Sequence, residues 1–311
     1  MLLLIQFTLM FASVLTLVAF GGMFSERSGV INLGLEGCMV IGALGSALVM
    51  NGLPSDTPLI FVLLLTVIVS VICGLVYSML LAVASIKFKA DQTITGIALN
   101  ILAPAFATVV VKAVTLRKEN QAKVSLTFFK FRNAFKFSIG KLEISYLFIV
   151  TIILVAVAYI ILYKTKFGLR LKACGEFPQS AASAGVNVIK YRYIGVGISG
   201  ILAGLGGLAY ITSGTTQWVA DQGVSGFGFL ALAVMIFGGW KPISIFLGAL
   251  LFGFFRAFNQ AYTGLNIEFL NNFKALYKML PYIVCLIVLA FTSKKSRAPK
   301  AEGIPYDRGQ R

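Results

Sequence analysis

The chain has 311 residues, of which 58% are hydrophobic and 12% charged, and its mean hydropathy is +0.90. A water-soluble core does not hide so much apolar surface, so lipid is expected to be the solvent for most of the chain. The net charge of +16 is high enough for a nucleic-acid-binding protein, but the basic residues cluster in short loops and in the tail. The positive-inside bias of a membrane protein explains that distribution, so no nucleic-acid partner is expected.

Apolar runs of membrane-spanning length predict about nine transmembrane helices. The first run lacks the basic region of a cleaved signal peptide and is kept as a span. The seventh is short and interrupted by glycines, which favours a broken or re-entrant helix that is buried in protein. The runs are residues 2–22, 29–50, 58–86, 93–115, 144–163, 192–212, 226–240, 242–260 and 276–292. The predicted fold class is an all-α, polytopic bundle in the cell membrane.

Lysines and arginines in the short loops set the expected orientation, with the N-terminus outside. Residues 1–293 then form a transmembrane domain that includes a cytoplasmic loop at 164–192, and residues 294–311 form a basic cytoplasmic tail. The basic stretch at 117–141 falls outside and is the exception to the rule. Long loops follow the rule poorly, so the orientation is kept.

Small residues recur at every fourth position in two of the runs, and such stripes allow helix backbones to approach closely inside a bilayer. The stripes are Gly34, Cys38, Gly42 and Ser46, and Gly195, Ser199, Ala203 and Gly207. Segments 29–45 and 223–239 also share a glycine-rich opening before an aliphatic run. This pattern suggests an internal repeat of the kind found in transporters, although apolar segments also match by chance.

Polar residues at the start of the fourth run are candidates for a solute pathway. Thr93, Gly96, Asn100 and Pro104 are spaced for one helical face, and Gln92 precedes them. An asparagine amide inside a span faces protein or water rather than lipid. A path for a polar solute and a hydrogen-bonded contact between packed helices explain Asn100 equally well.

Glu36 with Asn32, and Gln217 with Asp221, complete the candidate pathway. A carboxylate deep in a span costs about 2.5–3.5 kcal/mol. The favoured interpretation therefore places Glu36 in the first turn of its helix, where the helix dipole favours an anion. Gln217 and Asp221 flank Trp218 in an outer loop. They either meet a solute or its binding protein, or belong to an ordinary interfacial loop.

The absence of histidine from the chain excludes serine–histidine and cysteine–histidine catalysis, HExxH zinc sites and histidine proton relays. The four cysteines are widely spaced and predict neither a metal site nor a disulfide framework. The sequence has no P-loop and no array of membrane-embedded acids and bases. We therefore expect no catalytic residues, no metal and no bound cofactor, and a transporter of this kind takes its energy from a partner.

Five motifs resemble those of the membrane permeases of bacterial ABC importers, in the class that serves branched-chain amino acids, ribose-type sugars and nucleosides. They are ERSGVINLGLEG at 26–37, DQTITGIALN at 91–100, FGLRLKACGEFPQSAASAGVNV at 167–188, SGILAGLGGLAY at 199–210 and GFGFLALAVMIFGGWKPISIFLGALLFG at 226–253. The similarity covers nearly the whole chain, and the first two motifs are most similar to the nucleoside branch.

The resemblance implies a permease that pairs with a second related permease subunit or with itself. Its further partners are cytoplasmic ATPases, which hold ATP and Mg²⁺, an extracellular substrate-binding lipoprotein, and a nucleoside as substrate. The loop at 164–192 is then expected to hold a short coupling helix, at about 176–185, that docks on the ATPase. The residues assigned to coupling are Gly175, Glu176, Pro178, Ala181, Ala182 and Gly185.

One position departs from the family pattern, because Phe177 stands where many relatives carry asparagine. Two alternative functions stay open at this point: an ABC permease for ribose-type sugars, and a secondary carrier that needs no ATPase. Both place the chain in the cell membrane.

Overall fold

Helices make up most of the chain in the computed structural model. The structure describes residues 2–119, 125–127, 131, 134–140, 142–213, 217–261, 283 and 298–307. The helices are α1 (Leu2–Arg27), α2 (Leu35–Gly52), α3 (Leu59–Ala82), the π-helix η1 (Val83–Lys87), α4 (Gln92–Glu119), α5 (Tyr146–Lys164), α6 (Lys166–Glu176), α7 (Pro178–Ser183), α8 (Val188–Thr212), the 3₁₀ turn η3 (Ala220–Gln222), α9 (Phe227–Phe237) and α10 (Pro242–Ala261).

Among the described residues, seven helical segments are long and apolar enough to cross a membrane, and an eighth apolar helix, Pro242–Phe258, is somewhat shorter. They coincide with the first eight predicted spans, which confirms the polytopic helical fold. The ninth predicted span, 276–292, lies outside the described residues. The seventh span is short as predicted, since α9 has 11 residues and follows Gly226 in the left-handed conformation, with φ of 78°.

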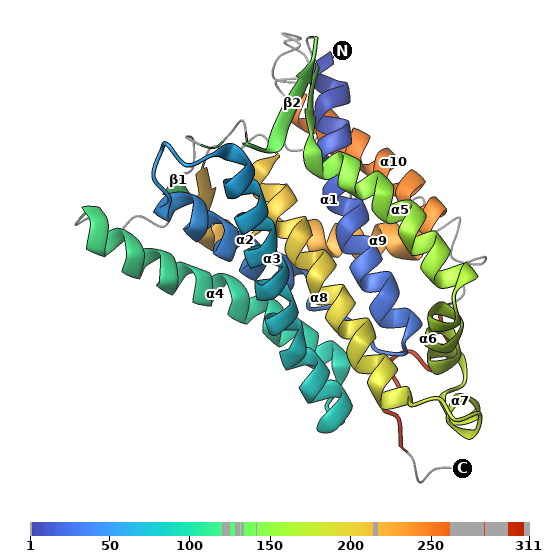
Figure 1. Cartoon of the computed structure of the whole chain (residues 1–311). Coiled ribbons are helices and arrows are strands. Elements are labelled where there is room, and N and C mark those ends of the chain that lie inside the picture. The colour runs from blue at the N-terminus through green and yellow to red at the C-terminus, as the bar shows by residue number, and fades with distance from the viewer. Residues whose placement is uncertain are drawn as a thin grey trace.

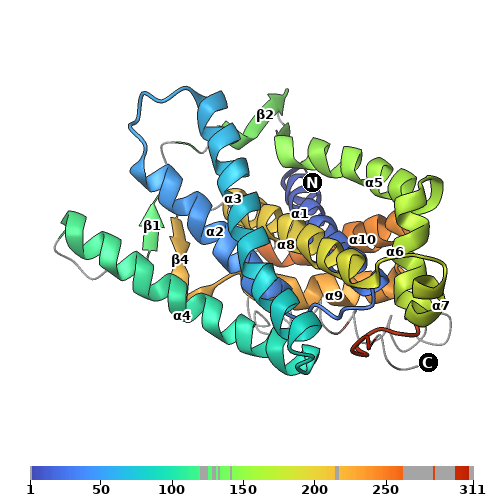
Figure 2. The ribbon, with the colours of Figure 1, turned by 60° about the horizontal axis from the view of Figure 1, so that its bottom comes forward.

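Helix α8 lies at the centre of the bundle, between α1 and α3 (Figure 1 and Figure 2). Residues of both predicted stripes allow helices to pack closely on α8. A Cβ added to Gly42 of α2 would lie 2.6 Å from Cα of Gly204 in α8, and one added to Gly195 of α8 would lie 3.0 Å from the carbonyl oxygen of Phe24 in α1. Gly74 of α3, outside the predicted stripes, also packs closely, since an added Cβ would lie 2.2 Å from the carbonyl oxygen of Gly200. Helix backbones approach this closely only where side chains are absent, as is typical of packing in a bilayer.

Helices α3, α4 and α5 border the bundle and present apolar side chains outward. On α5 only Leu147, Thr151, Ala158 and Leu162 are buried, which agrees with a helix that faces lipid. Helix α4 diverges from the rest of the bundle along its length (Figure 1). The outward side chains of α3 and α4 are large and aliphatic or aromatic, so lipid or another membrane subunit is their expected surrounding.

The two ends of the bundle differ in structure. At the strand end lie the N-terminus and four short strands, β1 (Ser125–Thr127), β2 (Lys136–Ile139), β3 (Leu142–Ser145) and β4 (Gln217–Val219). β1 pairs with β4, and β2 with β3, both antiparallel. The prediction of an all-helical chain omitted these strands. The basal end holds α6, α7 and residues 298–307 (Figure 1).

Candidate functional site

Glu36 joins the beginnings of two helices in the interior. It lies in the first turn of α2, as the favoured interpretation predicted. Its two carboxylate oxygens accept hydrogen bonds from the backbone N–H groups of Gly226, at 2.8 Å, and Gly228, at 2.6 Å. These donors belong to the N-terminus of α9, where no earlier carbonyl is available to accept them. The Glu36 carboxylate therefore lies at the N-termini of both α2 and α9, which are the positive ends of their helix dipoles.

The close approach of α2 and α9 depends on the absence of a side chain at Gly228. A Cβ at this position would lie 2.6 Å from both the amide nitrogen and Cα of Glu36. Gly228 lies in the glycine-rich opening of segment 223–239, one of the two similar segments in the sequence. We name Glu36, Gly226 and Gly228 the interior node.

Asn100 attaches α4 to the beginning of α2. Its Oδ1 accepts a hydrogen bond from the amide of Gly37 at 2.8 Å, and its Nδ2 donates to the carbonyl oxygen of Leu33 at 2.7 Å. Both ends of the side-chain amide are therefore engaged with backbone groups of a neighbouring segment. Of the two interpretations offered for Asn100, these contacts favour the packing role between helices.

Gln92 and Asn32 lie next to this junction and each has one buried polar atom without a partner among the described residues. Gln92 accepts from the amide of Ile31 at 2.7 Å, which leaves its Nε2 unpaired. Asn32 donates to Oγ of Ser199 at 2.8 Å, which leaves its Oδ1 unpaired. Buried polar atoms usually have a partner, so this donor and acceptor have unused capacity to bond with water or with a solute group.

Thr93 does not join these residues, because the structure places it on the exposed side of α4. The buried side carries Gln92, Gly96, Leu99 and Ala103 instead. The predicted stripe was therefore wrong by one position at its start. The spacing correctly predicts one helical face, but the sequence alone does not determine whether residue 92 or residue 93 lies on the side of α4 that faces the bundle.

Gln217 and Asp221 lie at the strand end, both exposed. Trp218 between them is buried, and its Nε1 donates to the carbonyl oxygen of Gly223 at 2.8 Å. Trp218 therefore stabilises the turn before α9 and is not an exposed interfacial tryptophan. The exposed side chains at 217 and 221 remain candidates for contact with a solute or a binding protein.

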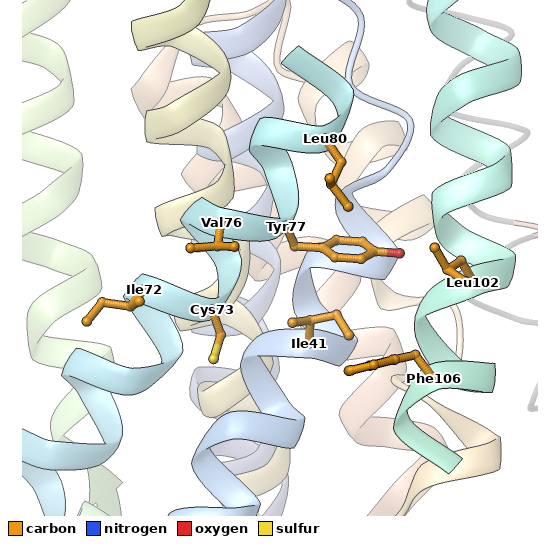
Figure 3. Close-up of a pocket in the computed structure, with 8 residues that line it drawn as sticks. All are labelled: Ile41, Ile72, Cys73, Val76, Tyr77, Leu80, Leu102 and Phe106. Carbon is orange, nitrogen blue, oxygen red and sulfur yellow. The ribbon is translucent and has the colours of Figure 1, made fainter. Parts of the chain in front are cut away.

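A cavity of about 460 Å³ opens between α3 and α4, with α2 behind it (Figure 3). Its lining residues are Ile41, Ile72, Cys73, Val76, Tyr77, Leu80, Leu102 and Phe106. The hydroxyl of Tyr77 already donates to the carbonyl oxygen of Leu99 at 2.6 Å. The cavity therefore offers an apolar solute or an acyl chain a good surface, but a polar solute finds little to bind there.

At the basal end, α7 lies within the predicted coupling segment, but the assigned residues divide into two groups. Gly175, Pro178 and Ala181 are buried against the chain itself. Gly185 is exposed and has a φ of +80°, a conformation that favours glycine. Glu176, whose side chain is 38% exposed, lies 3.9 Å from Arg27.

Ala182 of the assigned set is partly buried. The side chains that face outward at α7 are those of Phe177, Gln179, Ser180, Ser183 and Ala184. Phe177, at 55% exposure, is the largest of them. In the sequence, Phe177 departs from the family pattern because it is apolar where many relatives carry asparagine. In the structure, its side chain is exposed at the basal end.

Buried Glu26 and several partly buried charged groups lie near this end. Nε1 of Trp240 donates to Oε2 of Glu26 at 2.6 Å. Burial raises the pKa of the Glu302 carboxyl, against the lowering effects of its hydrogen bond with Glu26 and of the Arg27 charge. Burial, together with the charge of Arg27, lowers the pKa of Lys172. Within the described ranges no group of three or more histidine, cysteine or acidic residues has the arrangement of a metal site.

Comparison with known proteins gives a coherent result. A family described as branched-chain amino acid transport system / permease component matches residues 4–289. The guanosine ABC transporter permease protein NupQ of Bacillus subtilis is 38% identical, over 98% of this chain and 96% of that protein. The nucleoside ABC transporter permease proteins NupC and NupB of Lactococcus lactis are 35% and 25% identical, each over 96% of this chain and over 94% and 83% of their own lengths. No solved structure matches significantly.

Proposed function

This chain belongs to the permease family of the branched-chain amino acid transport systems, and from that premise we propose that it moves nucleosides across the cell membrane as the permease subunit of an ATP-driven importer. It is a multi-pass membrane protein. The observation that carries the substrate class is the match, over 96–98% of the chain, to permeases named for guanosine and for nucleosides. The ribose-type alternative has less support.

The energy for transport comes from a separate ATPase in this proposal. The 311-residue sequence has no P-loop, so the chain lacks the phosphate-binding loop that an ATPase of this kind uses. The exposed face of α7 and Phe177 is the proposed docking surface. An extracellular binding protein would deliver the nucleoside to the strand end, where Gln217 and Asp221 are exposed.

A second, different permease subunit is the proposed partner inside the membrane. Two permease proteins of Lactococcus lactis resemble this chain to different degrees, at 35% and 25% identity. This chain would then correspond to one member of an unlike pair, and the other member would be its partner. Pairing with a second copy of the same chain is the alternative that co-purification separates.

Alternating access in this proposal uses the interior node as a rigid connection. Glu36 ties the beginning of α2 to that of α9, so these two helices move as one unit. The unpaired buried atoms of Asn32 and Gln92 lie beside the junction of α2 and α4. A donor and an acceptor in this position suit the polar edge of a nucleobase once the bundle opens.

The test is reconstitution of the chain with a candidate partner permease, the ATPase and the binding protein in liposomes. We expect ATP-dependent uptake of nucleosides and none in vesicles whose ATPase carries an inactivated P-loop. A panel of purine and pyrimidine nucleosides with ribose measures the substrate class. Uptake of ribose without any nucleoside, or uptake by this chain alone under an ion gradient, would overturn the proposal.

A further inference from the structure

Residues 298–307, which we call the strap, lie across the basal end beside α6, α7 and α8 (Figure 1). We propose that the strap and α7 together form one docking surface for the ATPase, and that the strap connects this surface to the transmembrane helices. The inference rests on the proposed function, because the partner is the ATPase that the chain requires. It extends that proposal to a segment outside the coupling helix.

Two hydrogen bonds made by backbone groups of the strap attach it to α6 and α8. The amide of Ala301 donates to the carbonyl oxygen of Gly175, in the last turn of α6, at 2.8 Å. Nη1 of Arg192, in the first turns of α8, donates to the carbonyl oxygen of Ile304 at 2.9 Å. Arg192 is only 1% exposed, so this carbonyl is a partner that a buried guanidinium needs. Displacement of the strap therefore acts on α6 and α8 together.

Two further contacts join the strap to other parts of the bundle. Nζ of Lys89, in the turn between η1 and α4, lies 2.9 Å from Oδ2 of Asp307. Gly303, with a φ of +77°, passes so close to the segment before α2 that an added Cβ would lie 2.9 Å from Cδ1 of Ile31. The strap thus contacts four parts of the bundle that are far apart in the sequence.

The outward face of the strap is exposed and continuous with that of α7. Ile304 is 57% exposed, and Lys300 is exposed with its Nζ 4.8 Å from the ring centre of Phe177. Phe177 and Ile304 are therefore two large apolar side chains exposed at the same end of the bundle, and neither lies in a membrane-spanning helix. Apolar side chains exposed beyond the spans are typical of a surface that a partner covers.

The charge around these side chains favours an acidic partner. The exposed basic residues of the basal end include Lys164, Lys166, Arg170, Lys190 and Lys300. An apolar centre with a basic rim complements a groove that is apolar at its centre and acidic at its rim. We assign that groove to the ATPase rather than to lipid headgroups, because the same surface includes α7, which the family resemblance identifies as the coupling helix.

Site-directed photo-crosslinking tests the assignment in membranes that hold the complete transporter. Benzoylphenylalanine is placed at Ile304, at Phe177 and, as a control on the exposed strand end, at Gln222. We expect crosslinks to the ATPase from positions 304 and 177 and none from 222. Crosslinks from 177 to the ATPase, with only lipid or the second permease crosslinked at 304, would overturn the role of the strap while leaving the proposed function intact.

A pair of substitutions supplies the functional readout. Ile304→Asp puts a charge of the wrong sign into the apolar centre, and we expect about tenfold weaker ATPase binding with a matching fall in uptake. Ile304→Leu keeps the apolar contact and should retain nearly all activity. Because the side chain is exposed, both variants should insert and fold like the natural chain. Equal binding of the ATPase by Asp and Leu variants would contradict the proposal.

The ion pair of the strap allows a second, independent test. Lys89→Glu and Asp307→Lys each place like charges together, and the double variant restores an opposite pair. We expect each single variant to lower ATP-driven uptake by about two- to threefold and the double variant to recover it. Failure of the ATPase to associate even with the unaltered chain would count against the proposed function itself, and not only against the strap.

Discussion

The interior node and the basal end hold their elements by different means. At the node, a single carboxylate occupies two backbone donors at 2.8 and 2.6 Å between closely packed helices. At the basal end, α7 is six residues long and buries only Pro178 and Ala181. The node therefore has little freedom to change without loss of the fold, whereas α7 retains an open face. In the proposed mechanism, this difference separates a rigid connection between α2 and α9 from a surface on which the ATPase acts.

Replacement of Glu36 should give the largest effect. Glu36→Leu removes two charge-assisted hydrogen bonds, each with a net contribution of about 1.5–3 kcal/mol, and leaves the amides of Gly226 and Gly228 unpaired. We expect poor accumulation in the membrane and no uptake, measured by immunoblotting and transport. Asp56→Leu, in the exposed turn between α2 and α3, is the control. Normal thermal stability of the Glu36 variant would remove the distinction between the two regions.

Replacement of Asn100 should have a smaller effect of the same kind. Asn100→Leu loses two neutral hydrogen bonds, each contributing about 0.5–1.5 kcal/mol. We expect a lower unfolding temperature in detergent and reduced uptake, with the ATPase still bound. Thr93→Leu, about two turns away on the exposed side of α4, serves as the matched control and should change little. If only transport falls and stability is unchanged, the solute-pathway interpretation of Asn100 gains over the packing one.

Replacement of Gly185 should separate function from stability. Gly185→Val forces a side chain into the left-handed conformation, at a cost of about 1–2 kcal/mol confined to an exposed turn. We expect uptake and ATPase stimulation to fall while membrane insertion persists. Ala184→Val, at the neighbouring exposed position, controls for bulk alone. Unchanged transport in the Gly185 variant would place the coupling contact elsewhere on the basal end.

The smallest predicted effect concerns pH at the strap. Burial raises the pKa of Glu302 in the folded chain, so the protonated form favours the folded contact. Its contribution is complete below the pKa of the unfolded state and is lost as pH rises through the raised value. We expect the protection factors of the strap amides, corrected for the pH dependence of intrinsic exchange, to fall over that interval, and Glu302→Gln to abolish this fall. Protection factors that do not change with pH in the natural chain would show that Glu302 does not control attachment of the strap.

The sequence predicted the helices well because lipid imposes a length and a hydrophobicity on every span. It also placed Glu36 correctly, because a carboxylate is favourable in the first turn of a helix. It did not reveal the partners of Glu36, since Gly226 is 190 residues away and glycine carries no side-chain signal. The sequence indicated only a basic tail at the strap, because two of its attachments use the backbone amide of Ala301 and the backbone carbonyl of Ile304, groups that any residue supplies.

The attachments of the strap also bear on the order in which the chain is assembled. Gly175 and Arg192 leave the ribosome more than a hundred residues before the segment that binds them, the strap at 298–307. Until that segment is made, Arg192 lacks the carbonyl partner that it has in the finished protein. These contacts of the basal end therefore form only after α1 to α10 have been synthesised. An ATPase that recognises the strap would bind permeases in which the strap has docked and pass over those in which it has not.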